Sequence, residues 1–149
     1  MERTTVCYIR KENQVLMLFR NKRKQDINQG KWIGIGGHFE GEETPEECVL
    51  REVYEETGYL LPSVELRAEL TVFNDAAVEK IYVFTADFQQ GTLSECSEGT
   101  LAWIPIEKLF DLSMWEADRI FLPKILNGDP FFKMTIYYRQ NQLIRWKEE

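Results

Sequence analysis

Three glutamates, Glu52, Glu55 and Glu56, lie three and four residues apart in the stretch REVYEE. On a helix, which turns by about 100° per residue, their carboxylates fall within an arc of roughly 100°. Like charges this close repel one another unless a cation binds between them. Mg²⁺ suits such a place, because it prefers oxygen ligands and bridges carboxylates to phosphates. The same pattern is also typical of a solvated acidic face on a surface helix.

The residues around these glutamates predict where the helix begins and ends. Thr44 can cap it, Pro45 suits its first turn, and Glu47 completes a capping box. Gly58 provides a stop after Thr57, so we expect a helix from Pro45 to Thr57. The face expected to pack on a sheet comprises Val49, Leu50, Val53, Tyr54 and Thr57.

Three further features lie on or beside the acidic face. Arg51 lies four residues after Glu47 and four before Glu55, so it can hold a carboxylate by a forked, charge-assisted contact. Residues 34–37, Gly-Ile-Gly-Gly, form a glycine-rich loop in which backbone groups can approach a ligand closely. Cys48 falls by helical phase within the glutamate arc, near the expected site.

Taken together, these residues resemble the Nudix box. The match runs Gly37-x5-Glu43-x7-Arg51-Glu52-Val53-x-Glu55-Glu56-x-Gly58, and only Tyr59, where an aliphatic residue is usual, departs from it. The resemblance implies catalytic roles for Arg51, Glu52, Glu55 and Glu56, with the three glutamates as Mg²⁺ ligands and Mn²⁺ as a possible substitute. It also implies that the carbonyl of Gly36 ligates the metal. The glutamate matching Glu52 is often the general base in this family, and the sequence does not separate that role from metal binding.

An acid outside the box is expected to join the metal site. Glu98 is the candidate, with Glu95 as the alternative, and an ordinary acidic loop is the competing interpretation. The expected chemistry is hydrolysis of a phosphoanhydride, in which metal ions neutralise charge, position the phosphates and lower the pKa of a bound water. One of the acids must take the proton from that water. For His38, the only histidine, we expect a surface or hydrogen-bonding role.

Outside the box, the chain resembles the MutT-like, nucleotide-sanitising branch of the Nudix hydrolases, including the MutX type. The softer matches are Gly30–Gly37, Glu98–Trp103, Met114–Asp118 and Phe131–Phe132. This resemblance implies hydrolysis of a purine nucleoside triphosphate, typically 8-oxo-dGTP, to the monophosphate and pyrophosphate, and hence a part in DNA repair. Alternatives are another Nudix substrate, such as ADP-ribose, a dinucleoside polyphosphate or an RNA 5′ end, and a non-catalytic Nudix-like module. The intact box glutamates argue against the module.

A nucleotide pocket needs apolar walls and a few polar groups that read the base. Trp115 and Asp118 could supply a wall and a hydrogen-bond acceptor, although each aromatic residue could equally pack in the core. Ile33 and Ala117 stand where mammalian oxidised-purine enzymes carry Asn and Asp, so strict selectivity for 8-oxoguanine stays open. The other candidate substrate-binding residues are Arg20, Arg23, Lys24, Ile33, Gly37, Phe73 and Phe121. The basic ones could guide a phosphate tail or form a solvated loop together with Lys22 and Lys31.

Composition narrows the class of protein. A chain of 149 residues is expected to form one domain, residues 1–149, and its net charge of −7 argues against binding long nucleic acid. A small nucleotide is therefore the expected partner, and monomer and homodimer both stay open. No apolar stretch is long enough for a membrane span or a signal peptide. Three cysteines without metal-ligand spacing indicate reduced thiols in the cytoplasm.

The remaining pattern predicts an α+β fold, a Nudix-type α/β/α sandwich whose mixed β-sheet carries the box helix. Strands are expected at 4–9, 14–20, 32–35, 64–74, 80–88, 101–104, 131–139 and 142–146. Short helices are expected at 106–110 and 116–126. The first two strands and the last two should form hairpins, the latter with Asn141 at its turn.

Overall fold

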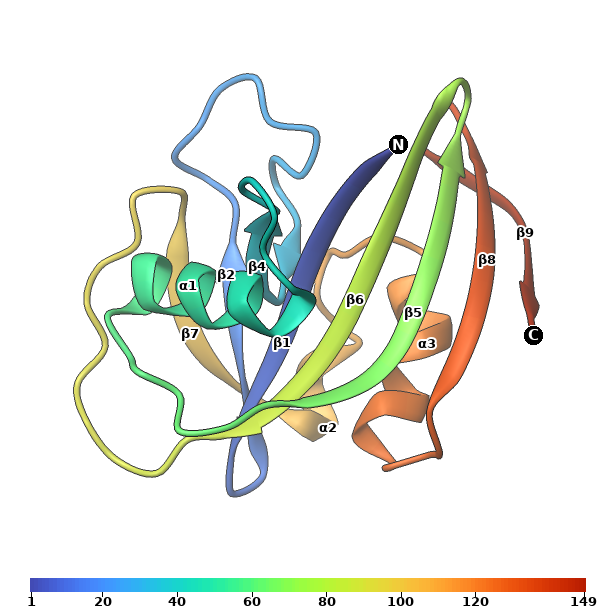
Figure 1. The fold of residues 1–149 in the computed structure, drawn as a ribbon. Helices are drawn as coiled ribbons and strands as arrows, with labels where there is room; N and C mark the ends of the chain where they lie inside the picture. Colours follow the sequence, from blue (N-terminus) through green and yellow to red (C-terminus); the bar gives the residue numbers. More distant parts are fainter.

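A mixed β-sheet of nine strands runs through the molecule, and helices lie on both of its faces (Figure 1). The computed structural model describes all 149 residues. Its elements are β1 (Glu2–Lys11), β2 (Gln14–Phe19), β3 (Trp32–Ile33), β4 (Ile35–His38), α1 (Pro45–Thr57), β5 (Glu65–Asn74), β6 (Ala77–Asp87), β7 (Thr100–Pro105), α2 (Ile106–Leu109), α3 (Asp118–Leu126), β8 (Phe132–Arg139) and β9 (Gln142–Glu148).

The strands follow the order β3-β2-β1-β6-β5-β8-β9, with β4 also paired to β1 and β7 to β2. The β1–β6 and β5–β8 pairs are parallel, and the other pairs are antiparallel. The α+β class and both hairpins are thus confirmed. Asn141, at the turn between β8 and β9, has a φ of 65°, which asparagine tolerates better than most residues.

Apolar side chains on both faces of the first hairpin explain why the sheet is covered on both sides. Because side chains alternate along a strand, Cys7 and Ile9 enter one core and Tyr8 enters the other. Helix α1 contributes Val49 and Val53 to the first core. Helices α2 and α3 contribute to the second core, through Leu109, Phe121, Leu122 and Ile125. No helix in the chain is long and apolar enough to cross a membrane.

Three details differ from the sequence predictions. The single strand expected at 32–35 is two, because the chain changes partner at Gly34 from β2 to β1. A Cβ at Gly34 would lie 2.6 Å from Cγ2 of Val6, so the crossing is too tight for a side chain. Helix α3 begins at Asp118, two residues later than expected. Tyr54 was expected to pack on the sheet but is 52% exposed, because the buried face of α1 is centred on Val49 and Val53.

Candidate active site

Helix α1 spans Pro45–Thr57 as predicted, because its ends are determined locally. The Thr44 hydroxyl accepts from the backbone N–H of Glu47 at 3.1 Å, and the Glu47 carboxylate accepts from the N–H of Thr44 at 2.9 Å. At the other end, Gly58 has a φ of 74° and its N–H donates to the carbonyl of Tyr54. These caps fix where the helix starts, and so fix the direction in which its glutamates project.

The glycine loop brings the backbone of β4 against β1 and against the helix. A Cβ at Gly36 would lie 1.9 Å from the carbonyl oxygen of Thr5, and one at Gly37 would lie 2.5 Å from the carboxyl carbon of Glu52. Only glycine permits either approach. The absence of a side chain at Gly37 therefore makes the space that the Glu52 carboxylate occupies.

Glu56 is the most deeply buried of the three glutamates, with 6% of its surface exposed. One of its carboxyl oxygens accepts from the backbone N–H of Gly36 at 3.1 Å. Burial, and then a hydrogen bond with Glu98, raise the pKa of Glu56 to about 10. The same hydrogen bond lowers the pKa of Glu98. Opposite shifts of this kind are expected when two neighbouring carboxyl groups share one proton.

Glu98 receives positive charge from the loop between β2 and β3. Arg23 Nη1 lies 3.0 Å from Oε1 of Glu98, and Arg20 Nη1 lies 3.7 Å from Oε2. The Arg23 side chain is 60% exposed, whereas that of Arg20 is 10% exposed and its guanidinium pairs at 2.7 Å with Asp26. Arg23 is therefore open to a further anion, and Arg20 is committed within the protein.

Arg51 binds several carboxylates at once. Its guanidinium forks onto Glu43 at 2.6 and 3.0 Å, and it reaches Glu52 at 3.0 Å and Glu55 at 3.1 Å. The hydrogen bond from Arg51 lowers the pKa of Glu43 to about 2. Burial raises the pKa of Glu52 despite its contact with Arg51. Arg51 makes the expected forked contact, with Glu43 as its main partner, while Glu47 serves the helix cap.

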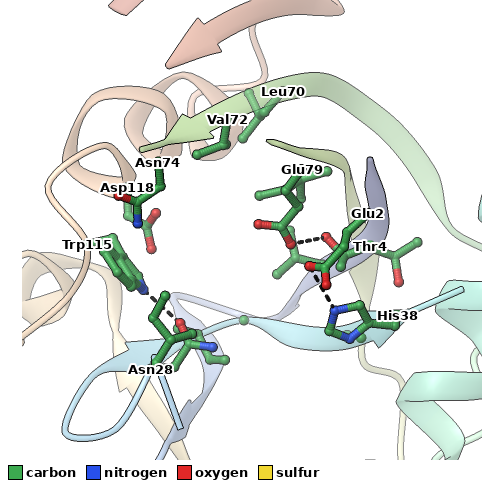
Figure 2. Close-up of a pocket in the computed structure, with 18 of the residues that line it drawn as sticks. Glu2, Thr4, Asn28, His38, Leu70, Val72, Asn74, Glu79, Trp115 and Asp118 are labelled. Atoms are coloured by element: carbon green, nitrogen blue, oxygen red, sulfur yellow. Dashed lines mark hydrogen bonds and ion pairs between the residues drawn. The ribbon is translucent and has the colours of Figure 1, made fainter. Parts of the chain in front are cut away.

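A cavity of about 730 Å³ connects this charged region to an apolar one. Its lining includes Glu52, Glu98 and the glycine loop, and also an apolar region that contains Trp115 and Phe121 beside Asp118. Figure 2 shows Trp115, Asp118, Asn74 and Asn28 on one side of the cavity, across from Glu2, Thr4, Glu79 and His38. The volume is in the range that holds small-molecule ligands.

The region around Trp115 also carries polar groups, and the protein holds them in place. Trp115 Nε1 donates to Oδ1 of Asn28 at 2.7 Å, and the Trp115 ring packs edge-on against Tyr138 with centroids 5.3 Å apart. Asp118 is the first residue of α3, and burial raises its pKa to about 7. A ligand here would meet an aromatic wall flanked by an amide and a titratable carboxyl group.

Comparison with known proteins matches residues 1–125 to the NUDIX domain. The chain belongs to the Nudix family. The uncharacterized Nudix hydrolase YvcI of Bacillus subtilis (strain 168) is 28% identical over 144 residues, which cover 93% of this chain and 87% of that protein. The oxidized purine nucleoside triphosphate hydrolase of Danio rerio is 27% identical over 111 residues, 73% of this chain and 71% of its own.

The fold agrees with this assignment. The crystal structure of the mutator MutT protein from Bacillus halodurans superposes with a TM-score of 0.89 and 26% identity, covering 100% of this chain and 98% of that one. The family and its named relatives identify the protein as a Nudix hydrolase. Its Nudix box corresponds to the end of β4, the loop that follows it and α1.

Tyr59, the residue that departs from the Nudix box, packs well in its position. The Tyr59 ring lies 4.6 Å from that of Phe88, centroid to centroid, and its hydroxyl accepts from the backbone N–H of Gln89 at 3.1 Å. Tyr59 also packs against the core on the α1 side of the sheet. An aromatic residue thus takes the packing position that an aliphatic residue usually fills in the Nudix box.

Most of the predicted substrate-binding residues lie around the cavity, but two do not. Phe73 stacks on Tyr137 at 5.3 Å and does not line the cavity, whereas its strand neighbours Val72 and Asn74 do. Side chains alternate along β5, so the predicted wall lies one residue away from Phe73. Lys24 is exposed and also lies outside the cavity lining. The lining residues among the candidates are Arg20, Arg23, Ile33, Gly37, Trp115, Asp118 and Phe121.

Several lining residues were not anticipated from the sequence. Asn28 and Asp26 lie in a polar loop with no periodic pattern, and Thr4 and Glu79 face the cavity from adjacent strands, joined by a hydrogen bond of 2.8 Å. The pairing of β1 with β6 brings those two strands together, and nothing local in either segment indicates it. His38 is exposed, with Nε2 3.4 Å from Glu2, which agrees with its expected surface role.

Proposed function

We propose that this Nudix hydrolase is a Mg²⁺-dependent pyrophosphohydrolase of purine nucleoside triphosphates that acts on an oxidised purine such as 8-oxo-dGTP. The observation that carries the proposal is one cavity lined both by Glu52 of the Nudix box, together with Gly36 and Glu98, and by the aromatic wall at Trp115. A nucleoside triphosphate has a polyphosphate that needs the first region and a base that needs the second. The similarity to an oxidized purine nucleoside triphosphate hydrolase supports this substrate class.

The donor groups fit a hard divalent cation. Glu52, Glu56 and Glu98 offer carboxylate oxygens, and Gly36 offers a carbonyl oxygen in the same region. The proton held between Glu56 and Glu98 occupies a place where positive charge is favoured. No group of three acidic, histidine or cysteine side chains lies close enough to hold a metal as it stands. Ligation therefore requires side-chain rotation, which the contacts of Arg51 with Glu52 and Glu55 must allow.

When bound, magnesium would neutralise phosphate charge and lower the pKa of a water molecule. The protein itself must orient the reactants and accept a proton. We assign proton acceptance to Glu52, whose carboxylate lies against Gly37 and is held by Arg51. The water oxygen forms a bond to phosphorus while the bond to the bridging oxygen breaks. That oxygen leaves with its electron pair, and the products are a nucleoside monophosphate and pyrophosphate.

The proposal is tested with a panel of nucleotides in Mg²⁺, with the products resolved by chromatography. We expect hydrolysis of at least one purine triphosphate to monophosphate and pyrophosphate. Glu56→Gln should reduce kcat by roughly two orders of magnitude or more, because it removes a proposed metal ligand at nearly constant volume. Glu46→Gln is the matched control, since Glu46 is an exposed glutamate in the first turn of the same helix.

Each result has a clear reading. Near-wild-type turnover by Glu56→Gln would show that the metal site is assigned to the wrong residue. Hydrolysis of ADP-ribose or a dinucleoside polyphosphate, with no turnover of triphosphates, would overturn the substrate class. Comparable kcat/KM values for 8-oxo-dGTP and dGTP would remove the preference for an oxidised base and leave triphosphate hydrolysis standing.

A further inference from the structure

The hydrogen bond between Trp115 and Asn28 determines which way the Asn28 amide points. An indole N–H can only donate, so the atom of Asn28 that lies 2.7 Å from Trp115 Nε1 must be the amide oxygen. The amide NH₂ group is then directed away from the indole. No protein atom accepts from it, and both residues line the cavity (Figure 2). The protein thus presents a hydrogen-bond donor beside its aromatic wall.

The backbone of Asn28 is also held in place. Its N–H donates to Oδ1 of Asp26 at 3.1 Å, and its carbonyl accepts from the N–H of Lys31 at 2.9 Å. The other oxygen of Asp26 pairs with Arg20 at 2.7 Å, and both of these side chains are about nine-tenths buried. A donor held from both its side chain and its backbone loses little freedom when it binds a ligand.

We propose that Asn28 is a specificity-determining residue, whose amide NH₂ donates a hydrogen bond to a ring carbonyl oxygen of a 6-oxopurine nucleotide. The proposal rests on the proposed function, because it requires that a purine nucleotide occupy the cavity. Asp118 lies on the same side of the cavity and can receive the ring N–H groups that neighbour such a carbonyl (Figure 2). A 6-aminopurine would place an amino donor against the Asn28 donor, and neither group would be satisfied.

The test is Asn28→Asp, which is nearly isosteric. An aspartate keeps an oxygen for the Trp115 N–H but replaces the NH₂ donor with a second acceptor. We expect the ratio of kcat/KM for dGTP to kcat/KM for dATP to fall by roughly tenfold or more. The ratio of Kd values for dGMP and dAMP, measured by calorimetry without added metal, should change in the same direction. Asn28→Ala removes the donor without adding charge, and should also lower the preference for the 6-oxopurine.

Gln29→Glu is the matched control for charge. It adds the same negative charge at the next residue, which is exposed and does not line the cavity. General repulsion of nucleotides, or a loss of support for Trp115, would weaken both purines by the same factor. Only a group that contacts the base changes their ratio.

The outcomes separate this inference from the proposed function. A dGTP-to-dATP ratio within about twofold of wild type in both Asn28 variants would overturn the inference while hydrolysis stands. If wild type hydrolyses no triphosphate but binds dGMP more tightly than dAMP, and Asn28→Asp removes that preference, the proposed reaction fails and the inference stands. A wild-type protein that neither binds nor hydrolyses purine nucleotides would refute both.

Discussion

We expect Glu56→Gln to lower the activity with Mg²⁺ and to raise the stability of the metal-free protein at neutral pH. The Glu56 side chain is 6% exposed, accepts one hydrogen bond from Gly36, and has a pKa raised to about 10 by burial and by Glu98. At neutral pH, folding is therefore coupled to the uptake of a proton by the Glu56 carboxyl group, which lowers the free energy of unfolding. Glutamine has the same size and never ionises, so the variant folds without that requirement.

The sign and size of the effect follow from the two pKa values of Glu56. The unfolded chain has a value near 4.5, and the folded protein one of about 10. Between these values only the folded state holds the proton, so the free energy of unfolding falls as pH rises. One proton changes it by about 1.4 kcal/mol per pH unit, or roughly 3 kcal/mol between pH 6 and pH 8. The lowered pKa of Glu98 acts below this window and does not offset the slope.

The assay is urea unfolding of wild type and Glu56→Gln at pH 6 and pH 8, with EDTA present. Asp118, whose pKa is raised to about 7, titrates in both proteins, so the difference between the two pH profiles isolates Glu56. We expect the variant to gain roughly 3 kcal/mol relative to wild type on going from pH 6 to pH 8. Parallel profiles, within about 0.5 kcal/mol, would refute a neutral, buried Glu56.

Four other substitutions test separate parts of the site. Arg51→Lys is expected to lower kcat by roughly tenfold, because an ammonium cannot fork onto Glu43; equal kcat values in steady-state assays would contradict this. Asp118→Asn is expected to flatten the pH dependence of KM for a purine triphosphate between pH 6 and pH 8, where the wild-type carboxyl group, with a pKa of about 7, changes from donor to acceptor as pH rises. Trp115→Ala is expected to raise KM roughly tenfold, whereas Phe73→Leu should lower Tm and leave KM within about twofold, and the reverse pattern would overturn the lining of the cavity.

What could be predicted from the sequence was decided by local interactions. The ends of α1 were predicted correctly because Thr44, Glu47 and Gly58 act within one turn of the helix. The hairpin of β1 and β2 was predicted for the same reason, since its turn is short and polar and both strands are rich in β-forming residues. In these segments the tertiary structure reinforces what the local sequence favours.

The errors and omissions depend on long-range pairing. Phe73 was placed in the cavity because its aromatic character was visible, but which face of β5 it occupies is set by pairing with β6 and β8. Asn28 was missed because its role depends on Trp115, 87 residues away. Such contacts leave no periodic signal in the chain.

The repulsion among the box glutamates is relieved in two ways, by ion pairing and by protonation, so the three carboxyl groups differ in charge and in burial. Glu52 and Glu55 are ion-paired with Arg51, which lies at the surface side of the helix, while Glu56 is buried and neutralised by a proton. If a cation binds at Glu56 as proposed, we expect it to displace that proton, so that its binding releases a proton and becomes more favourable as pH rises. It must also compete with Arg51 for Glu52. A guanidinium that holds Glu43 by two hydrogen bonds can release Glu52 without losing its own position. We therefore expect Glu43 to anchor Arg51, so that Arg51 can position Glu52 and still release it to a metal ion.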